Sequence, residues 1–399
     1  MKRLNYSGED KLIFGCSVKD TDGSTHHLLQ QAINSNLDWD YIVENALGNG
    51  TSSLLYRNLR KIDEDCLVPG WVIEKLSDVY FDVRARNIFL LEELGKVLKK
   101  FNEEKISSVV LKGASILENV YQDIGLRTMG DIDILIRKEQ FCEIDKSLRE
   151  SGYFSDYNWS DYMNISTSRY LNSLYYQKRQ GEIYVFLHLH WHIINTTVPT
   201  YYYNDIDIQR FWQQARPVTI AGVKSSIMAP HHLLIHLSEH ILKHSCRPFV
   251  LFCDIFEVIN HYSKEGLDWD LLIKDTVEFN LNKAVYFGLY FSSELSGAEV
   301  PANVLARLKP SHISYGERKI QSLVEKNRTF PGLKYFLYFV MNEKLADKLK
   351  FILRVVFPPR EVLALQYVMA PEDIRFYHYF LKLRNAFVKG LKILPYLWR

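Results

Sequence analysis

The sequence lacks a long apolar segment, a large excess of charge of either sign, and any closely spaced pair of cysteines. No uninterrupted apolar run approaches the roughly 20 residues that a membrane-spanning helix needs. The net charge of +2 is too small to give the whole molecule an electrostatic footprint for nucleic acid, so any such surface must be local. These absences argue against an integral membrane protein and against a uniformly basic nucleic-acid binder.

The cysteines are odd in number and scattered, and no CxxC pair occurs among them: Cys16, Cys66, Cys142, Cys246 and Cys253. This usage is typical of proteins from a reducing compartment. The N-terminal stretch MKRLNYSGEDKLIFGCSVKD is basic at its start, but its apolar run LIFG is too short for the core of a signal peptide. We therefore expect a cytoplasmic protein.

What the chain has in abundance is apolar and aromatic surface to bury. Its 399 residues are 47% hydrophobic and include 25 tyrosines and 22 phenylalanines, which indicates a folded protein of two or three packed units. Residues 26–100 carry apolar side chains at spacings of three and four, which predicts helices. Asp38 is placed to cap one of them, and Pro69 with Gly70 separates the next two.

From Ile106 the pattern changes to short β-branched runs. Residues 106–111 and 131–136 are predicted strands, and the helix-compatible residues 114–121 lie between them. Residues 184–193, YVFLHLHWHI, predict a third strand, and after Pro230 the chain returns to successive helices. The predicted fold class is α+β, with a small mixed sheet between N- and C-terminal helical regions.

The second strand carries two aspartates one residue apart, in the sequence GDIDILI. Because side chains at i and i+2 of a strand point to the same side, Asp131 and Asp133 are predicted to project together, roughly 6 to 7 Å apart at the backbone. Two carboxylates in one pocket repel, and a hard divalent cation such as Mg²⁺ would neutralise both, with Mn²⁺ as an alternative. We therefore expect a metal site at these two residues.

The turn after the first strand, LKGAS, is suited to binding phosphate. Gly113 removes a side chain that would block close approach, and the amides of Ala114 and Ser115 lie at the positive end of the following helix. Lys112 supplies a point charge, and Arg127 can bind a phosphate through two hydrogen bonds. Chance occurrence and an ordinary salt bridge are the alternatives for each element taken alone.

This stretch resembles the nucleotidyltransferase fold of the DNA polymerase β type, and more narrowly a bacterial family of uncharacterised nucleotidyltransferases with the approximate pattern vLKGaal…Y…g.R.mgDiDlLv. Similar landmarks, such as LHLHWHI and RVVFPPRE, extend the resemblance over nearly the whole chain. The matching residues are Leu111, Lys112, Gly113, Tyr121, Gly125, Arg127, Met129, Gly130, Asp131, Asp133 and Leu135.

The resemblance implies metal-dependent transfer of a nucleotidyl group from a nucleoside triphosphate to a hydroxyl-bearing acceptor. The acceptor stays open: a small molecule, a glycan precursor, a peptide, a protein or RNA. Enzymes of this fold commonly add a third carboxylate from a following strand, and His188 stands at that place here. His188 and His190 are therefore candidate catalytic residues, and Glu182 is the candidate substitute acid. The alternative function is a catalytically inactive nucleotide-binding or regulatory protein.

Two further features have competing interpretations. The segment HHLLIHLSEHILKH places a stripe of histidines four residues apart, which suits either zinc or packing against the catalytic core: His232, His236, His240 and His244. Asp254, on the next predicted helix, has the same two readings of site residue and packing contact. Residues 374–399 contain basic and aromatic residues but no acid. We expect a helix packed through its Leu, Phe and Tyr side chains, with a peripheral membrane or RNA surface as the less favoured alternative.

The expected organisation is a helical N-terminal region at 1–100, a nucleotidyltransferase core at 101–220, a helical domain with the histidine-rich helix at 221–330, and a basic, aromatic helical region at 331–399.

Overall fold

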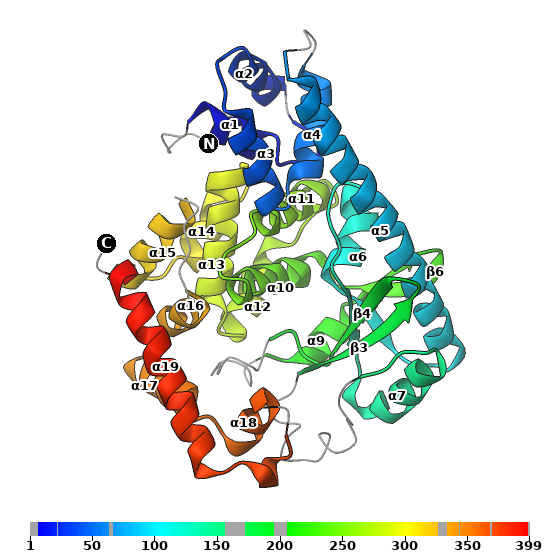
Figure 1. Ribbon diagram of the computed structural model, residues 1–399, viewed down its shortest axis with the longest axis vertical. Coiled ribbons are helices and arrows are strands. Elements are labelled where there is room, and N and C mark those ends of the chain that lie inside the picture. Colours follow the sequence, from blue (N-terminus) through cyan, green and yellow to red (C-terminus); the bar gives the residue numbers. More distant parts are fainter. Residues whose placement is uncertain are drawn as a thin grey trace.

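A computed structural model shows a six-stranded mixed sheet surrounded by helices, which confirms the predicted α+β class (Figure 1). The structure describes residues 7–21, 23–63, 67–155, 172–194, 206–325, 333–342, 344–367 and 369–397. Cys66 lies outside these ranges.

The sheet has the strand order β3-β4-β2-β1-β6-β5. Neighbouring β1 and β2 are antiparallel, whereas β2 pairs with β4 and β1 with β6 in parallel. The strands are β1 (Ser108–Val110), β2 (Ile132–Ile136), β3 (Ser173–Gln180), β4 (Ile183–His190), β5 (Arg216–Ile220) and β6 (Val223–Ile227).

Alternation along β2 sends its side chains to two different cores. Ile132, Ile134 and Ile136 pack with the long helix α5 (Gly70–Glu103) on one face of the sheet. Leu135 packs on the other face, in the core of the C-terminal helical domain. Asp133 has the same parity as Leu135, so the fold directs this carboxylate toward the helical domain.

The N-terminal helices form a separate core of their own before the chain enters α5. Asp38 caps α3 as predicted, since its side chain accepts a hydrogen bond of 3.0 Å from the amide of Tyr41. The helices here are α1 (Gly8–Gly15), α2 (Gly23–Ile33), α3 (Trp39–Gly48) and α4 (Ser52–Ile62).

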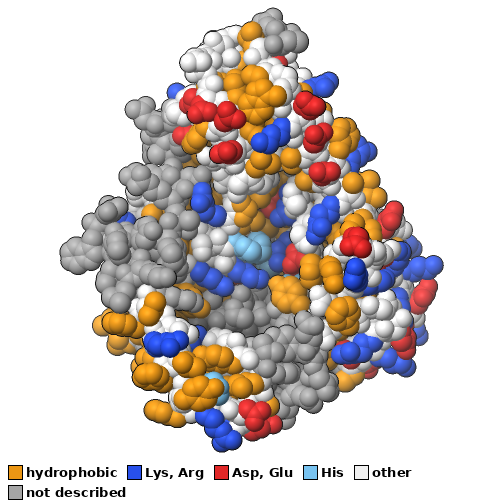
Figure 2. Space-filling view, viewed as in Figure 1, with side chains coloured by type: hydrophobic (Ala, Val, Ile, Leu, Met, Phe, Trp, Pro, Cys, Tyr) orange, Lys and Arg blue, Asp and Glu red, His pale blue; other side chains and the backbone are white. Residues whose placement is uncertain are grey.

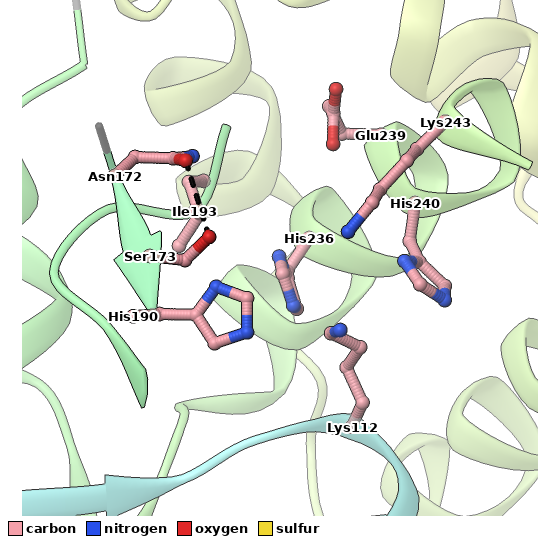
Figure 3. A pocket seen from close by; sticks show the side chains of 9 residues that line it. All are labelled: Lys112, Asn172, Ser173, His190, Ile193, His236, Glu239, His240 and Lys243. Carbon is pink, nitrogen blue, oxygen red and sulfur yellow. Dashed lines mark hydrogen bonds between the residues drawn. The ribbon is translucent and has the colours of Figure 1, made fainter. Parts of the chain in front are cut away.

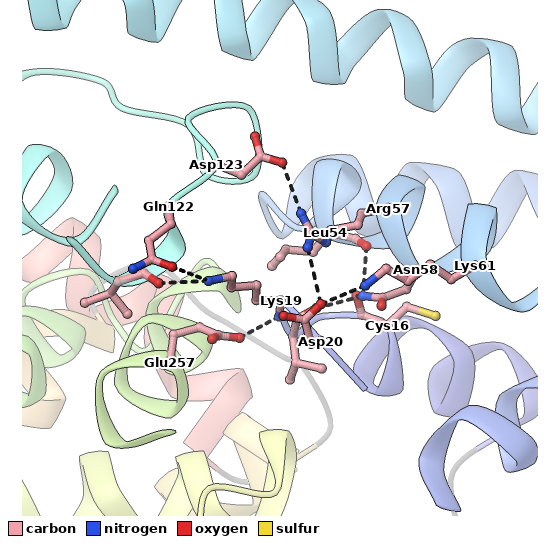
Figure 4. Close-up of polar contacts among 12 residues, drawn as sticks. Cys16, Lys19, Asp20, Leu54, Arg57, Asn58, Lys61, Gln122, Asp123 and Glu257 are labelled. Atoms are coloured by element: carbon pink, nitrogen blue, oxygen red, sulfur yellow. Dashed lines mark hydrogen bonds and ion pairs between the residues drawn. The ribbon is translucent and has the colours of Figure 1, made fainter. Parts of the chain in front are cut away.

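Polar contacts attach this N-terminal region to the rest of the molecule (Figure 4). Arg57 bridges Asp20 and Asp123 at 3.3 and 3.1 Å. The backbone amide of Lys19 donates to the carboxyl of Glu257 at 2.5 Å, and the Lys19 side chain donates to the carbonyl of Val120. The segment after α1 therefore connects the sheet domain to a helix of the C-terminal half.

The chain returns to helices after β6, as predicted, with Pro230 at the first position of α10. Helices α10, α11 and α13 share one large apolar core. The helices of this part are α9 (Ile208–Gln213), α10 (Pro230–Lys243), α11 (Val250–Ser263), α12 (Trp269–Glu278), α13 (Asn282–Phe291) and α14 (Ala302–Leu308); α6 (Lys112–Ile116) and α7 (Phe141–Glu150) belong to the sheet domain.

The C-terminal helix α19 lies along the side of the molecule opposite α5 (Figure 1). Its aromatic residues Phe376, Tyr377, Phe380 and Phe387 are exposed, so the prediction that these side chains pack on the body is wrong. Among the described residues, no helix is both long enough and apolar enough to cross a bilayer. The remaining helices are α15 (Tyr315–Glu325), α16 (Leu333–Met341), α17 (Leu345–Val356), α18 (Arg360–Tyr367) and α19 (Phe376–Leu397).

Candidate functional site

The strand, turn, helix and strand predicted around the two aspartates form one compact unit. Strand β1 ends at Val110, and the chain turns through Lys112, whose φ of 34° lies in the left-handed region, into α6 and a π-helical turn, Leu117–Tyr121. The amide of Leu111 donates to the carbonyl of Asp133 at 3.0 Å. The LKGAS turn and the aspartate strand therefore lie side by side.

The carboxylate of Asp133 contacts three side chains of this part of the molecule. Its Oδ1 lies 2.8 Å from Lys112 Nζ, 2.7 Å from His190 Nε2 and 3.4 Å from His188 Nδ1, and the carboxylate is buried. Burial alone would raise the pKa of Asp133, but the charge of Lys112 and the hydrogen bonds from the two histidines hold it well below the usual value. Asp133 is thus a permanent anion at the end of the turn.

Asp131 immediately precedes β2 and is only partly buried. Burial and the neighbouring charge of Asp133 raise the pKa of Asp131 to about 6. The two carboxylates thus repel each other, as predicted for a pair directed into one site.

His188 and His190 come from β4, which pairs with β2 in parallel and places His188 directly beside Asp133. Burial lowers the pKa of His188 to about 4 and that of His190 well below its usual value, so both rings are neutral at physiological pH. Glu182 cannot replace the missing third acid, because it lies at the other end of β4, in the turn after β3, exposed and paired with Arg179.

Arg127 lies next to the same turn, but its guanidinium is already bound. Its Nε and a terminal nitrogen donate to the carboxylate of Asp254 on α11 at 2.8 to 3.2 Å, and its other terminal nitrogen donates to the carbonyl of Thr128. Tyr121 also donates to Asp254, at 3.1 Å. Asp254 is fully buried and joins the sheet domain to the helical domain.

The residues of the predicted phosphate turn are all buried. A side chain on Gly113 would meet Arg127 and Met129 at 3.3 Å, so the glycine makes room for these two residues. Ala114 packs in the core beneath α5, and the Ser115 hydroxyl donates to the carbonyl of Lys112 at 2.8 Å. Of this group, only Lys112 lines the pocket described next.

A pocket opens between this unit and α10, and five lysine or histidine side chains line it (Figure 3). Lys112 and His190 come from the sheet domain, whereas His236, His240 and Lys243 come from α10. Figure 2 shows a hollow in which histidine lies among Lys and Arg side chains, with acidic groups to one side. Burial and the nearby charge of Lys112 lower the pKa of Lys243. Glu239 also lines the pocket, which therefore presents two lysines and one carboxyl group, and Lys112 and His190 connect it to Asp133.

Lys243 is the member that the sequence did not single out. It lies on the same face of α10 as His236 and His240, at i+7 and i+3, and this spacing is the signal that could have identified it. Neither ring nitrogen of His236 has a hydrogen-bond partner among the described residues, although the side chain is buried. The histidine stripe therefore faces the catalytic core over part of its length.

The N-terminal end of the stripe has a different environment. His232 lies 3.0 Å from Asp275 of α12, and its neighbour His231 lies 3.5 Å from the same carboxylate. Arg210 already forms an ion pair with Asp275 at 2.9 Å. The four predicted histidines do not converge on one point, because His232 serves this contact while His236 and His240 line the pocket.

Within the part of the chain that the structure describes, two groups of three side chains bring potential ligand atoms within 4.8 Å of one another: Asp133 with His188 and His190, and His231 with His232 and Asp275. The first group lies beside Asp131 and the pocket with the two lysines, so it is the group that a metal-dependent transfer would use. Carboxylates at positions 131 and 133 fit a divalent cation in this place.

Residues 35–297 match the family model described as uncharacterised nucleotidyltransferase. The chain belongs to this family. The match covers the sheet, the aspartate pair and helices α10 to α13. No curated protein and no solved structure matches this nucleotidyltransferase family member significantly.

Membership of the nucleotidyltransferase family confirms the resemblance seen in the sequence and supports a general nucleotidyltransferase activity with a nucleoside triphosphate as substrate.

Proposed function

We propose that the protein is a metal-dependent nucleotidyltransferase that transfers a nucleoside monophosphate from a nucleoside triphosphate to a hydroxyl group. The observation that carries this proposal is the position of Asp133, a buried carboxylate that contacts Lys112 of the LKGAS turn, beside a pocket lined by Lys112 and Lys243. In the reaction, the acceptor oxygen forms a bond to the α-phosphorus, the bond from that phosphorus to the bridging oxygen breaks, pyrophosphate leaves, and the hydroxyl proton passes to a base.

Asp131 and Asp133 would hold the divalent cation, which neutralises the triphosphate and activates the acceptor hydroxyl when bound. The neutral imidazoles of His188 and His190 lie against the same carboxylate and can accept a proton or coordinate a metal.

The positive groups of the pocket suit the triphosphate. Lys243 faces the pocket from α10, and Lys112 enters it from the turn, so phosphate oxygens between them would receive charge-assisted hydrogen bonds. Gly113, Ala114 and Ser115 would contribute through the position of the turn. Arg127 would act mainly by fixing this turn against α11, because its guanidinium is held by Asp254.

Binding and turnover separate this function from its rival. Titration calorimetry with each nucleoside triphosphate and a divalent metal should show binding, and a cell extract that supplies the acceptor should then support pyrophosphate release. Absence of both results would contradict the proposal.

A second candidate, a nucleotide-binding regulator without catalysis, is favoured by one observation: His188 lies beside Asp133 where this fold commonly has a carboxylate. Binding without pyrophosphate release, with manganese as well as magnesium, would support the regulator.

A further inference from the structure

The group of potential ligands around Asp133 is unusual for a magnesium site because two imidazoles lie beside the carboxylate. Asp133, His188 and His190 each place one potential ligand atom within 4.8 Å of the other two, and all three side chains are buried. Mg²⁺ prefers oxygen ligands and keeps several waters, whereas imidazole favours first-row transition metals. A set of two histidines and one carboxylate is typical of sites for such metals.

His188 provides a second, independent observation. Its Nδ1 faces Asp133, and its Nε2 is buried without a hydrogen-bond partner among the described residues. The ring of Tyr175 stacks on His188 at a centroid distance of 3.6 Å, which fixes the plane of the imidazole. A buried ring nitrogen without a hydrogen-bond partner would be satisfied by a bound ion or water.

This inference rests on the proposed function and deepens it. We propose that the nucleotidyltransferase centre selects a first-row transition-metal ion, such as Mn²⁺ or Co²⁺, over Mg²⁺, because His188 and His190 join Asp133 as protein ligands, with Asp131 beside them.

Lys112 would compete with a metal ion for the carboxylate of Asp133. Its ammonium lies 2.8 Å from the Asp133 oxygen that both histidines approach, so an ion bound there would displace it. The released Lys112 would then be available to the triphosphate in the adjoining pocket. Metal binding and phosphate binding would thereby be coupled through one side chain.

The test measures metal binding by the full-length protein, without nucleotide, after treatment with a chelator. Mn²⁺ is followed by paramagnetic resonance, Co²⁺ by its visible absorption, and Mg²⁺ by calorimetry. We expect one Mn²⁺ or Co²⁺ per chain, bound roughly 10- to 100-fold more tightly than Mg²⁺. Equal or tighter binding of Mg²⁺ would overturn the proposal.

Substitutions identify the ligands. His188→Asp should shift the preference toward Mg²⁺ by roughly 10-fold or more, and Lys112→Met should tighten binding of Mn²⁺. His190→Asn provides an independent loss of one ligand if the His188 variant fails to fold. His261→Gln, which removes a partly exposed histidine on α11, should leave the metal affinity and the metal preference unchanged. An unchanged metal preference in folded His188→Asp, together with unchanged Mn²⁺ affinity in His190→Asn, would overturn the assignment.

The second histidine and aspartate group must be separated from this one. Asp275→Asn removes the carboxylate shared by His231 and His232 and should leave the bound Mn²⁺ or Co²⁺ in place. Loss of the ion in this variant, with retention in the His190 variant, would assign it to the other group. Metal binding is measured without nucleotide, so the two proposals can fail separately. A preference for Mg²⁺ together with intact nucleotidyl transfer would refute only the metal assignment. Absence of transfer by protein that binds Mn²⁺ or Co²⁺ as expected would refute only the proposed function.

Discussion

The guanidinium of Arg127 and the carboxylate of Asp254 form a buried, two-pronged ion pair between the segment before β2 and α11, with the shortest distance at 2.8 Å. Removing one member of such a pair leaves a buried charge without a partner. The pair therefore makes the position of the LKGAS turn depend on the helical domain.

Arg127→Met should lower the free energy of unfolding by about 3 to 5 kcal/mol. Adding Asp254→Asn should restore part of that loss, since the amide keeps an acceptor for Tyr121 and removes the unpaired anion. Chemical denaturation of both variants measures the difference. If Arg127→Met binds nucleoside triphosphate weakly but unfolds like the wild type, the arginine is a phosphate ligand and not a positioning residue.

The two aspartates should respond oppositely to the same substitution. Asp131→Asn removes a carboxylate whose pKa is raised to about 6 by burial and by Asp133, so it should abolish transfer and raise stability at pH 7 by on the order of 1 kcal/mol. Asp133→Asn leaves Lys112 buried without its anion and should cost about 3 to 5 kcal/mol. Thermal melting at constant pH compares the two. Equal effects on stability would contradict the assigned environments.

Lys243→Met should weaken binding of the nucleoside triphosphate roughly 10- to 100-fold, because one charge-assisted hydrogen bond is worth about 1.5 to 3 kcal/mol. Stability should not fall, since burial and Lys112 already disfavour this ammonium. Calorimetric titration measures the affinity. The matched control is Lys264→Met, which removes an exposed lysine after α11. Similar losses in both variants would indicate a general charge effect instead of a pocket.

Glu257 should make stability depend on pH far from the site. Burial raises the pKa of Glu257 from its usual value of about 4.5 to about 7, so the folded protein retains a proton that the unfolded chain loses in this interval. Stability should therefore fall as the pH rises from about 4.5 to 7, by at most about 3 kcal/mol. Glu257→Gln keeps an oxygen for the amide of Lys19 and should flatten this slope in urea denaturation. An unchanged slope would show that another group causes it.

Much of the fold follows from local patterns. The helices after Pro230 and the strand containing Asp133 carry clear periodicities. A helix between two strands is more typical of a parallel pair, so the antiparallel direction of β1 and β2 does not follow from the sequence. Strands β3, β5 and β6 were not predicted. Each is partly exposed and rich in polar residues, such as SLYYQKRQ in β3, and gains its conformation from pairing in the sheet.

The candidate site could likewise be predicted from the sequence only in part. The contact between Lys112 and Asp133 is inherent in the spacing of the turn and strand, since the two segments are neighbours in the sheet. The partners of Arg127 and the approach of Lys243 come from helices more than 100 residues later, and no local pattern specifies such contacts. The exposed aromatic residues of α19 show the same limit, because its amphipathic pattern predicts a buried face without specifying what covers it.

The most direct test uses nucleoside triphosphates labelled at the α-phosphate or at the γ-phosphate, incubated with the full-length protein, a divalent metal and cell extract. The α-label should become attached to an acceptor while the γ-label leaves in pyrophosphate, and Asp131→Asn, still folded, should transfer neither. Transfer of the γ-label to the acceptor, or undiminished transfer of the α-label by Asp131→Asn, would contradict nucleotidyl transfer at this aspartate pair.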